Sequence, residues 1–204
     1  MGRKPAAGAW MRRFTTAVIA ALVLTTLHTT PADAAAVGDG PFLIANTALA
    51  WPCTPQGVYI DTTDAPSPWH VEVVKAALVR FRAATGRSWP LVDDPDAPVR
   101  IRWYDPKGHE GALAVVGADD QYYRGADVQL SPKVAKEWLL STVLHELGHV
   151  GGLEHVSDPT EVMGLYPTKP HERYAVGDLV GLLMANRGCS GSAASLSGRS
   201  LGRA

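Results

Sequence analysis

Three histidines and a pair of glycines lie within the eleven residues 145–155, whose sequence is H-E-L-G-H-V-G-G-L-E-H. Residues four apart on an α-helix are separated by about 40° around the axis and roughly 6 Å along it, so His145 and His149 would project side by side. Two imidazoles in this arrangement can share one metal ion. Glu146 would point away from the ligand direction and still reach a water molecule bound to that ion.

The third histidine, His155, lies ten residues after His145. A continuous helix would carry it about 15 Å along the axis, too far for both to bind one ion at roughly 2.0 to 2.1 Å. The helix must therefore end before His155. Gly151 and Gly152 are the places for this, because glycine adopts the left-handed backbone conformation without a steric penalty. We expect one of the two to make the turn that brings His155 back.

The types of side chain in this motif favour a catalytic zinc site. Three neutral histidines fill three corners of a zinc tetrahedron and leave the fourth for water. Zinc lowers the pKa of that water to about 7 and polarises a bound carbonyl group. We therefore predict amide hydrolysis, with His145, His149 and His155 as zinc ligands and Glu146 as general base and then general acid. The alternative is that these histidines decorate a helix and its loop and bind nothing.

The elements that would position the motif indicate an α+β domain. Apolar residues recur every three and four positions over 69–84, which is typical of an amphipathic helix, whereas 99–104 alternates with the two-residue period of a strand. The motif itself falls at the end of a second predicted helix, 136–150, which has one apolar stripe. The predicted strands are 58–60, 99–104, 112–116 and 126–130, and the predicted helices are 69–84, 136–150 and about 174–186.

Residues 1–34 have the three parts of an export signal. Arg12 and Arg13 form a basic start, residues 14–27 are mostly apolar, and Ala32-Asp33-Ala34 ends in small residues. A membrane anchor is the alternative, but the apolar run is shorter than the roughly 20 residues that a spanning helix needs. We therefore expect a secreted, extracellular protein.

The remaining 170 residues are enough for one domain with a hydrophobic core. We expect this domain to span 35–189, followed by a flexible Ser/Gly-rich tail over 190–204. Without residues 1–34 the chain loses four basic residues and one acidic residue, so its formal charge changes from −1 to −4. This balance does not favour nucleic acid as a partner. We expect a monomer that acts on a protein or peptide and, once the signal is removed, binds no membrane.

The pattern H-E-x-x-H-x-x-G-x-x-H over 145–155 resembles the long zinc motif of the metzincin metallopeptidases. That family also has a methionine in a tight turn beneath the metal, and Met163 follows His155 by eight residues. The segment from His155 to Met163, with its Asp158-Pro159 pair, is similar to the matrixin branch. In place of the matrixin Met-Tyr-Pro, this chain has Met163-Gly-Leu-Tyr-Pro, two residues longer, so no role is carried over to the tyrosine, Tyr166.

This resemblance implies a fold and a function. The fold would be a twisted five-stranded, mostly parallel sheet with an antiparallel edge strand and three helices. An extended substrate would bind along that edge strand, for which we select 111–117. The function would be that of a secreted zinc endopeptidase. A non-catalytic zinc-dependent peptide-binding module and a zinc amidase acting on cell-wall peptides are the alternatives.

Two further groups of residues have alternative interpretations. Cys53 and Cys189, the two cysteines of the chain, are expected to form a disulfide, as an exported protein permits. The alternative is that the Cys53 thiolate blocks the zinc, as the prosegment cysteine does in the family that the motif resembles. A set of loop acids could bind Ca²⁺ through hard oxygen ligands or could simply be solvated. These acids are Asp119, Asp120 and Asp127.

Overall fold

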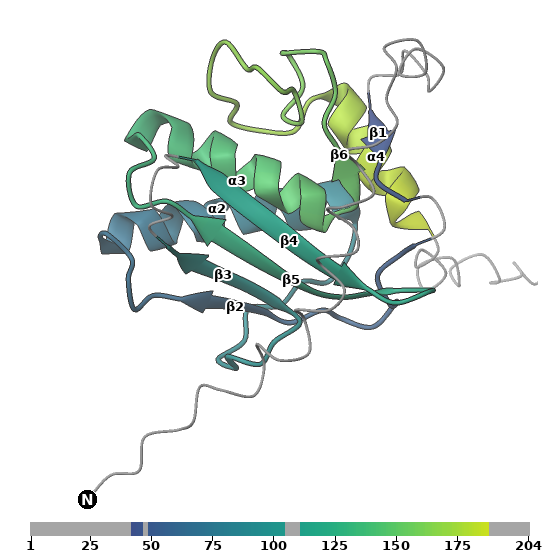
Figure 1. Ribbon diagram of the computed structural model, residues 1–204, viewed down its shortest axis with the longest axis horizontal. Helices are drawn as coiled ribbons and strands as arrows, with labels where there is room; N and C mark the ends of the chain where they lie inside the picture. The colour runs from purple at the N-terminus through teal and green to yellow at the C-terminus, as the bar shows by residue number, and fades with distance from the viewer. Residues whose placement is uncertain (1–41, 47–48, 105–110, 188–204) are drawn as a thin grey trace, which may run out of the picture. The chain divides into compact units, whose positions relative to one another are not determined.

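The main sheet has four strands in the order β2-β3-β5-β4 (Figure 1). The computed structural model describes residues 42–46, 49–104 and 111–187, all within the unit that spans 40–204. β2 and β3 are parallel, as are β3 and β5, whereas β4 at the edge is antiparallel to β5. The strands are β2 (Val58–Asp61), β3 (Val99–Trp103), β4 (Ala112–Ala118) and β5 (Tyr123–Leu130).

The predicted mostly parallel sheet with an antiparallel edge strand is confirmed, but its five strands are wrong for the described part of the chain. Each of the four β-prone runs forms one strand, so no run remains for a fifth. Instead, β1 (Leu43–Ile44) pairs with β6 (Leu153–Glu154) in a separate antiparallel sheet. This small sheet contacts α4 (Val176–Ala185), away from the main sheet (Figure 1).

The three predicted helices are all present in the structure. α2 spans Pro68–Thr85 and ends at Gly86, whose positive φ of 64° allows its N–H to bond the Arg82 carbonyl. α3 spans Lys136–Val150, as the apolar stripe predicted. α4 begins two residues later than predicted, because the carboxylate of Asp178 accepts the N–H of Ala175, the residue before the helix.

The hydrophobic core lies between the sheet and the helices α2 and α3, which cover one of its faces (Figure 1). In β3 the alternate residues Val99, Ile101 and Trp103 are buried on this side. Phe81 of α2 and Leu144 of α3 are fully buried against them. Removing each such side chain from water stabilises the fold by about 1.5 to 3 kcal/mol. The helix that carries the motif is therefore held on a rigid support.

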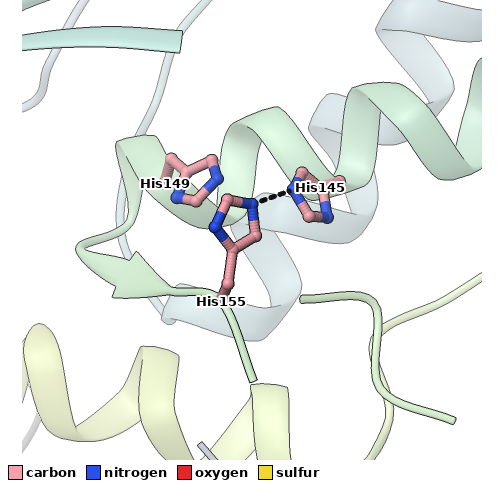
Figure 2. Close-up of side chains that lie close together, drawn as sticks. All are labelled: His145, His149 and His155. Atoms are coloured by element: carbon pink, nitrogen blue, oxygen red, sulfur yellow. Dashed lines mark hydrogen bonds between the residues drawn. The ribbon is translucent and has the colours of Figure 1, made fainter. Parts of the chain in front are cut away.

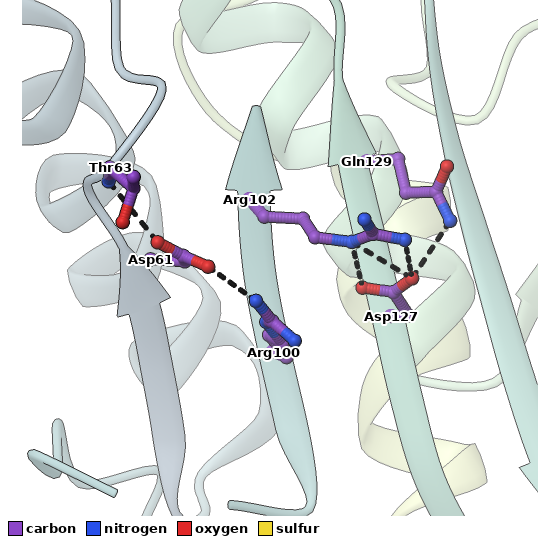
Figure 3. A network of polar contacts seen from close by, with 6 residues as sticks. All are labelled: Asp61, Thr63, Arg100, Arg102, Asp127 and Gln129. Atoms are coloured by element: carbon purple, nitrogen blue, oxygen red, sulfur yellow. Dashed lines mark hydrogen bonds and ion pairs between the residues drawn. The ribbon is translucent and has the colours of Figure 1, made fainter. Parts of the chain in front are cut away.

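The other face of the sheet carries paired charges from three neighbouring strands (Figure 3). Arg100 of β3 forms an ion pair with Asp61 of β2. Arg102, two residues further along β3, donates to both oxygens of Asp127 on β5, with a shortest distance of 2.7 Å. Gln129 also donates to Asp127. Side chains two apart on a strand share a face, so this network makes this face of the sheet polar.

Two predictions concern residues that the structure does not describe. The signal segment 1–34 and the tail 190–204 both lie outside the described residues, and so does Cys189. Cys53 is disulfide-bonded. A bonded sulfur has no thiolate to offer a metal, which argues against the alternative in which Cys53 blocks the zinc. Within the described residues no helix is both long and apolar enough to span a membrane.

Candidate metal centre

Two of the three histidines, His145 and His149, project from the last two turns of α3. The Nδ1 atom of His145 lies 2.8 Å from the Val162 carbonyl oxygen, and that of His149 lies 2.8 Å from the Leu153 carbonyl oxygen. A carbonyl oxygen can only accept, so both Nδ1 atoms must carry the proton. Each ring therefore presents the lone pair of Nε2, which is the arrangement found in metal-binding histidines.

Gly152 makes the turn that returns the third histidine. Its φ is +93°, whereas Gly151 is still in the right-handed helical region with φ of −71°. The prediction that one glycine of the pair reverses the chain is thus confirmed. Gly151 is needed for a different reason, because a β-carbon there would overlap the side chain of Leu182. The turn leads directly into β6, and His155 follows.

The three imidazoles converge on one point (Figure 2). The Nε2 atoms of His145 and His155 are 3.1 Å apart, and one nitrogen from each of the three rings lies within 4.8 Å of the other two. Two ligands of a tetrahedral zinc ion are about 3.3 Å apart. Converging lone pairs repel each other unless a proton or a metal ion lies between them. The three histidines could therefore hold one metal ion, and their nitrogen donors suit zinc.

Glu146 follows His145 on α3 and faces the same cleft. Its side chain is only 6% exposed. Burial raises the pKa of its carboxyl to about 7, although a hydrogen bond to the backbone of Ala114 on β4 acts in the opposite direction. Burial also lowers the pKa of His145 to about 4, so this imidazole is neutral at pH 7, as a ligand must be. A carboxyl group with a pKa near neutrality can both accept and donate a proton.

Met163 packs against α3, the helix that carries two of the histidines. It is 1% exposed, and a β-carbon on Gly148 would overlap its sulfur atom. Its carbonyl oxygen accepts the N–H of Val156, 3.0 Å away, which closes the loop that follows His155. The methionine predicted to underlie the site is thus buried against the helix residue that precedes His149.

A pair of buried carboxylates, which the sequence did not single out as functional, holds this methionine turn. Asp178 of α4 accepts the N–H groups of Val162 and Met163 at 2.8 and 3.2 Å. In the other direction, Glu161 accepts the N–H groups of Gly177 and Asp178 at the start of α4. The turn and the helix therefore stabilise each other. An acidic residue in the first turn of a predicted helix was the available signal for Asp178.

The histidines open into a cleft of about 570 Å³. β4 forms one wall of it, so the strand selected for the substrate lines the same cleft as the three histidines. The opposite wall combines the turn after α3 with residues from the start of the described chain, Ala45, Asn46 and Leu49. None of the residues lining the cleft is Lys or Arg.

Other predicted residues lie away from this centre. Tyr166 is 83% exposed and does not line the cleft. Asp119 pairs with Arg124, and Asp127 pairs with Arg102, so both acids already have cationic partners. Among the described residues, His145, His149 and His155 are the one group of three or more His, Cys, Asp or Glu side chains close enough to share an ion. The loop acids, Asp120 included, form no comparable group there.

Comparison of the chain with protein-family models and with curated proteins found no match.

Proposed function

We propose that this chain is a secreted zinc endopeptidase of the metzincin type, similar to the matrixins. The observation that carries the proposal is the convergence of His145, His149 and His155, with Glu146 beside them in the same cleft. A structural zinc site is closed by four protein ligands, whereas three ligands at an open cleft leave a position for water.

In this proposal the residues have separate tasks. Zinc held by the three histidines would supply a Lewis acid and lower the pKa of a bound water. Val162 and Leu153 orient the rings of His145 and His149 by accepting their Nδ1 protons. Glu146 accepts the proton that the attacking water loses and donates it to the nitrogen of the leaving amine. Because Glu146 is buried, bulk water does not compete for that proton.

The proposed substrate is an extended segment of a protein or peptide. β4 lies at the edge of its sheet, and no other strand of the described residues pairs with its outer side, so a peptide can add there as a further strand. The cleft beside β4 has the volume for several side chains and an apolar wall for them. We propose that the protein acts outside the cell as a monomer, with no nucleic acid or membrane as partner.

The test uses the Glu146→Gln variant, which keeps the size of the side chain and removes its charge. We expect about one zinc per chain in both the wild type and the variant, and a loss of casein cleavage of at least about 100-fold in the variant. Glu137→Gln, an exposed position on the same helix, is the matched control and should retain activity.

Two results would contradict the proposal. Full activity of Glu146→Gln would remove the role given to Glu146. Zinc-loaded wild type that cleaves neither folded nor denatured proteins would not be an endopeptidase. In that case, tight binding of peptides would indicate a binding module, and cleavage of cell-wall fragments alone would indicate an amidase.

A further inference from the structure

The turn that carries His155 is held by groups from outside the histidine motif. The last carbonyl groups of an α-helix have no partner within the helix. Here the Val150 carbonyl accepts the indole N–H of Trp51 at 2.6 Å. The Gly151 carbonyl accepts from the Asn186 side chain at 3.2 Å, and the Gly152 carbonyl accepts the N–H of Ala45 at 2.9 Å.

Two of these three donors belong to one segment, which we call the N-terminal arm and define as residues 42–46 and 49–51. The arm also supplies β1, whose residues Leu43 and Ile44 pair with Glu154 and Leu153. The segment 150–154 is thus bonded to the arm at both of its ends. His155 is the next residue.

Trp51 is the fixed point of the arm. Its side chain is 1% exposed, and its ring packs edge-on against Trp89 with the centroids 5.4 Å apart. Tyr123 lies on another side of it, at 5.7 Å. Arg87 donates to its carbonyl oxygen at 3.2 Å. The indole N–H that reaches Val150 is therefore held in place by the core of the domain.

We propose that the N-terminal arm is a positioning element of the metal site, with Trp51 as its principal positioning residue. His145 and His149 lie on one helix, so the helix itself sets the distance between them. His155 depends on the course of 150–154, and any freedom in that turn must be lost when the metal binds. By holding the turn beforehand, the arm strengthens metal binding. This inference rests on the proposed zinc site.

The experiment compares Trp51→Phe with Trp89→Phe in the full chain. Both residues lie in one aromatic cluster, are almost fully buried and lose one indole hydrogen bond. The indole N–H of Trp89, however, donates to the Thr85 hydroxyl on α2 at 3.0 Å and not to the turn that leads to His155. We expect both variants to lower the melting temperature. The zinc dissociation constant should rise about 10-fold or more in Trp51→Phe and less than about 2-fold in Trp89→Phe.

A second measurement uses the metal-free protein. Amide hydrogen exchange over 150–155 should be faster in Trp51→Phe than in Trp89→Phe when each is compared with its own global stability. Equal zinc affinity in the two variants would overturn the proposal, and so would equal exchange. If the wild type itself binds no zinc, the proposed function fails, and the exchange data still decide whether the arm holds the turn.

A third variant keeps the proposal testable if Trp51→Phe does not fold. Ala45→Pro removes the N–H that bonds Gly152, at an exposed position that follows a strand residue. It should weaken zinc binding in the same direction. Unchanged affinity in Ala45→Pro would overturn the role of the arm.

Discussion

The sulfur of Met163 occupies the space in which a β-carbon of residue 148 would lie, so Gly148 and Met163 fit each other without a gap. Gly148 precedes His149 on α3, and Met163 belongs to the loop that returns from His155. This contact joins α3, which carries two of the histidines, to the loop that follows the third.

Gly148→Ala should therefore force Met163 out of its position. We expect a loss of about 1 to 3 kcal/mol in the free energy of unfolding, as for other overpacked cores, together with weaker zinc binding. Denaturant unfolding measures the first effect. In the double variant with Met163→Ala the total loss should be smaller than the sum of the two single losses, because the overlapping sulfur is gone. Gly111→Ala, where a β-carbon would meet nothing within 4 Å, is the neutral control.

Removal of zinc should lower the stability of the wild type. A ligand that binds only the folded state stabilises it by about 2.7 kcal/mol when its free concentration is 100 times its dissociation constant. The melting temperature should fall on addition of a chelator and rise again when zinc is restored. In His155→Ala the melting temperature should not respond to the chelator. A response equal to that of the wild type would show that zinc acts at another place in the chain.

Asp178→Asn should loosen the methionine turn. The carboxylate accepts the N–H groups of Val162, Met163 and Ala175, whereas an amide has one acceptor oxygen and an NH₂ group that would face donors. At least one buried N–H group would lose its partner, at a cost of about 1 to 3 kcal/mol in urea unfolding. Asp158→Asn, at an exposed loop position, should change stability by about 0.5 kcal/mol or less.

Glu161 should make the protein less stable as the pH rises. Burial, and then the nearby charge of Asp178, raise the pKa of its carboxyl above the ordinary value of 4.5. The folded state therefore holds this proton more tightly than the unfolded state does, and the resulting stability is present below pH 4.5 and is lost as the pH rises through the folded pKa. Glu161→Gln loses the acceptor of one buried N–H group and should be less stable than the wild type at low pH, but this difference should narrow as the pH rises, because only the wild type loses a proton there.

Asp119 supplies a control of opposite sign. The backbone N–H of Gln121 and further donors lower the pKa of its carboxyl to about 2. The stability that this carboxylate contributes is present above pH 3.8 and is lost as the pH falls toward 2. Asp119→Asn should therefore be less stable than the wild type at neutral pH, and this difference should disappear in acid. A Glu161→Gln variant whose stability follows the wild type at every pH would contradict the assignment made for Glu161.

The local parts of this structure could be predicted from the sequence because their causes are local. The apolar stripe before His149 defined α3 to the residue, and alternation defined β3. The spacing of the histidines required a reversal at Gly151 or Gly152. The spacing did not show which of the two glycines makes the turn, because both can adopt a positive φ. In the structure Gly152 makes the turn, and Gly151 is needed because Leu182 packs against it.

The non-local parts could not be predicted in this way. The fifth strand came from a resemblance and not from a β-prone run, and it is not formed in the described part of the chain. The bond from Trp51 to Val150 joins residues 99 apart, and no pattern in either segment indicates it. Glu161 reads as an ordinary loop acid until α4 is placed next to it.

The hydrogen bonds between the arm and the turn 150–154 set a limit on how far the chain can be trimmed from its N-terminal side. Removal of a leader near Ala35 leaves the whole arm in place, whereas a protease that cuts after Ala45 would take away β1 and a donor to Gly152. Loss of these residues would loosen the turn that leads to His155 and so weaken the proposed metal site, without touching any of the three histidines or Glu146.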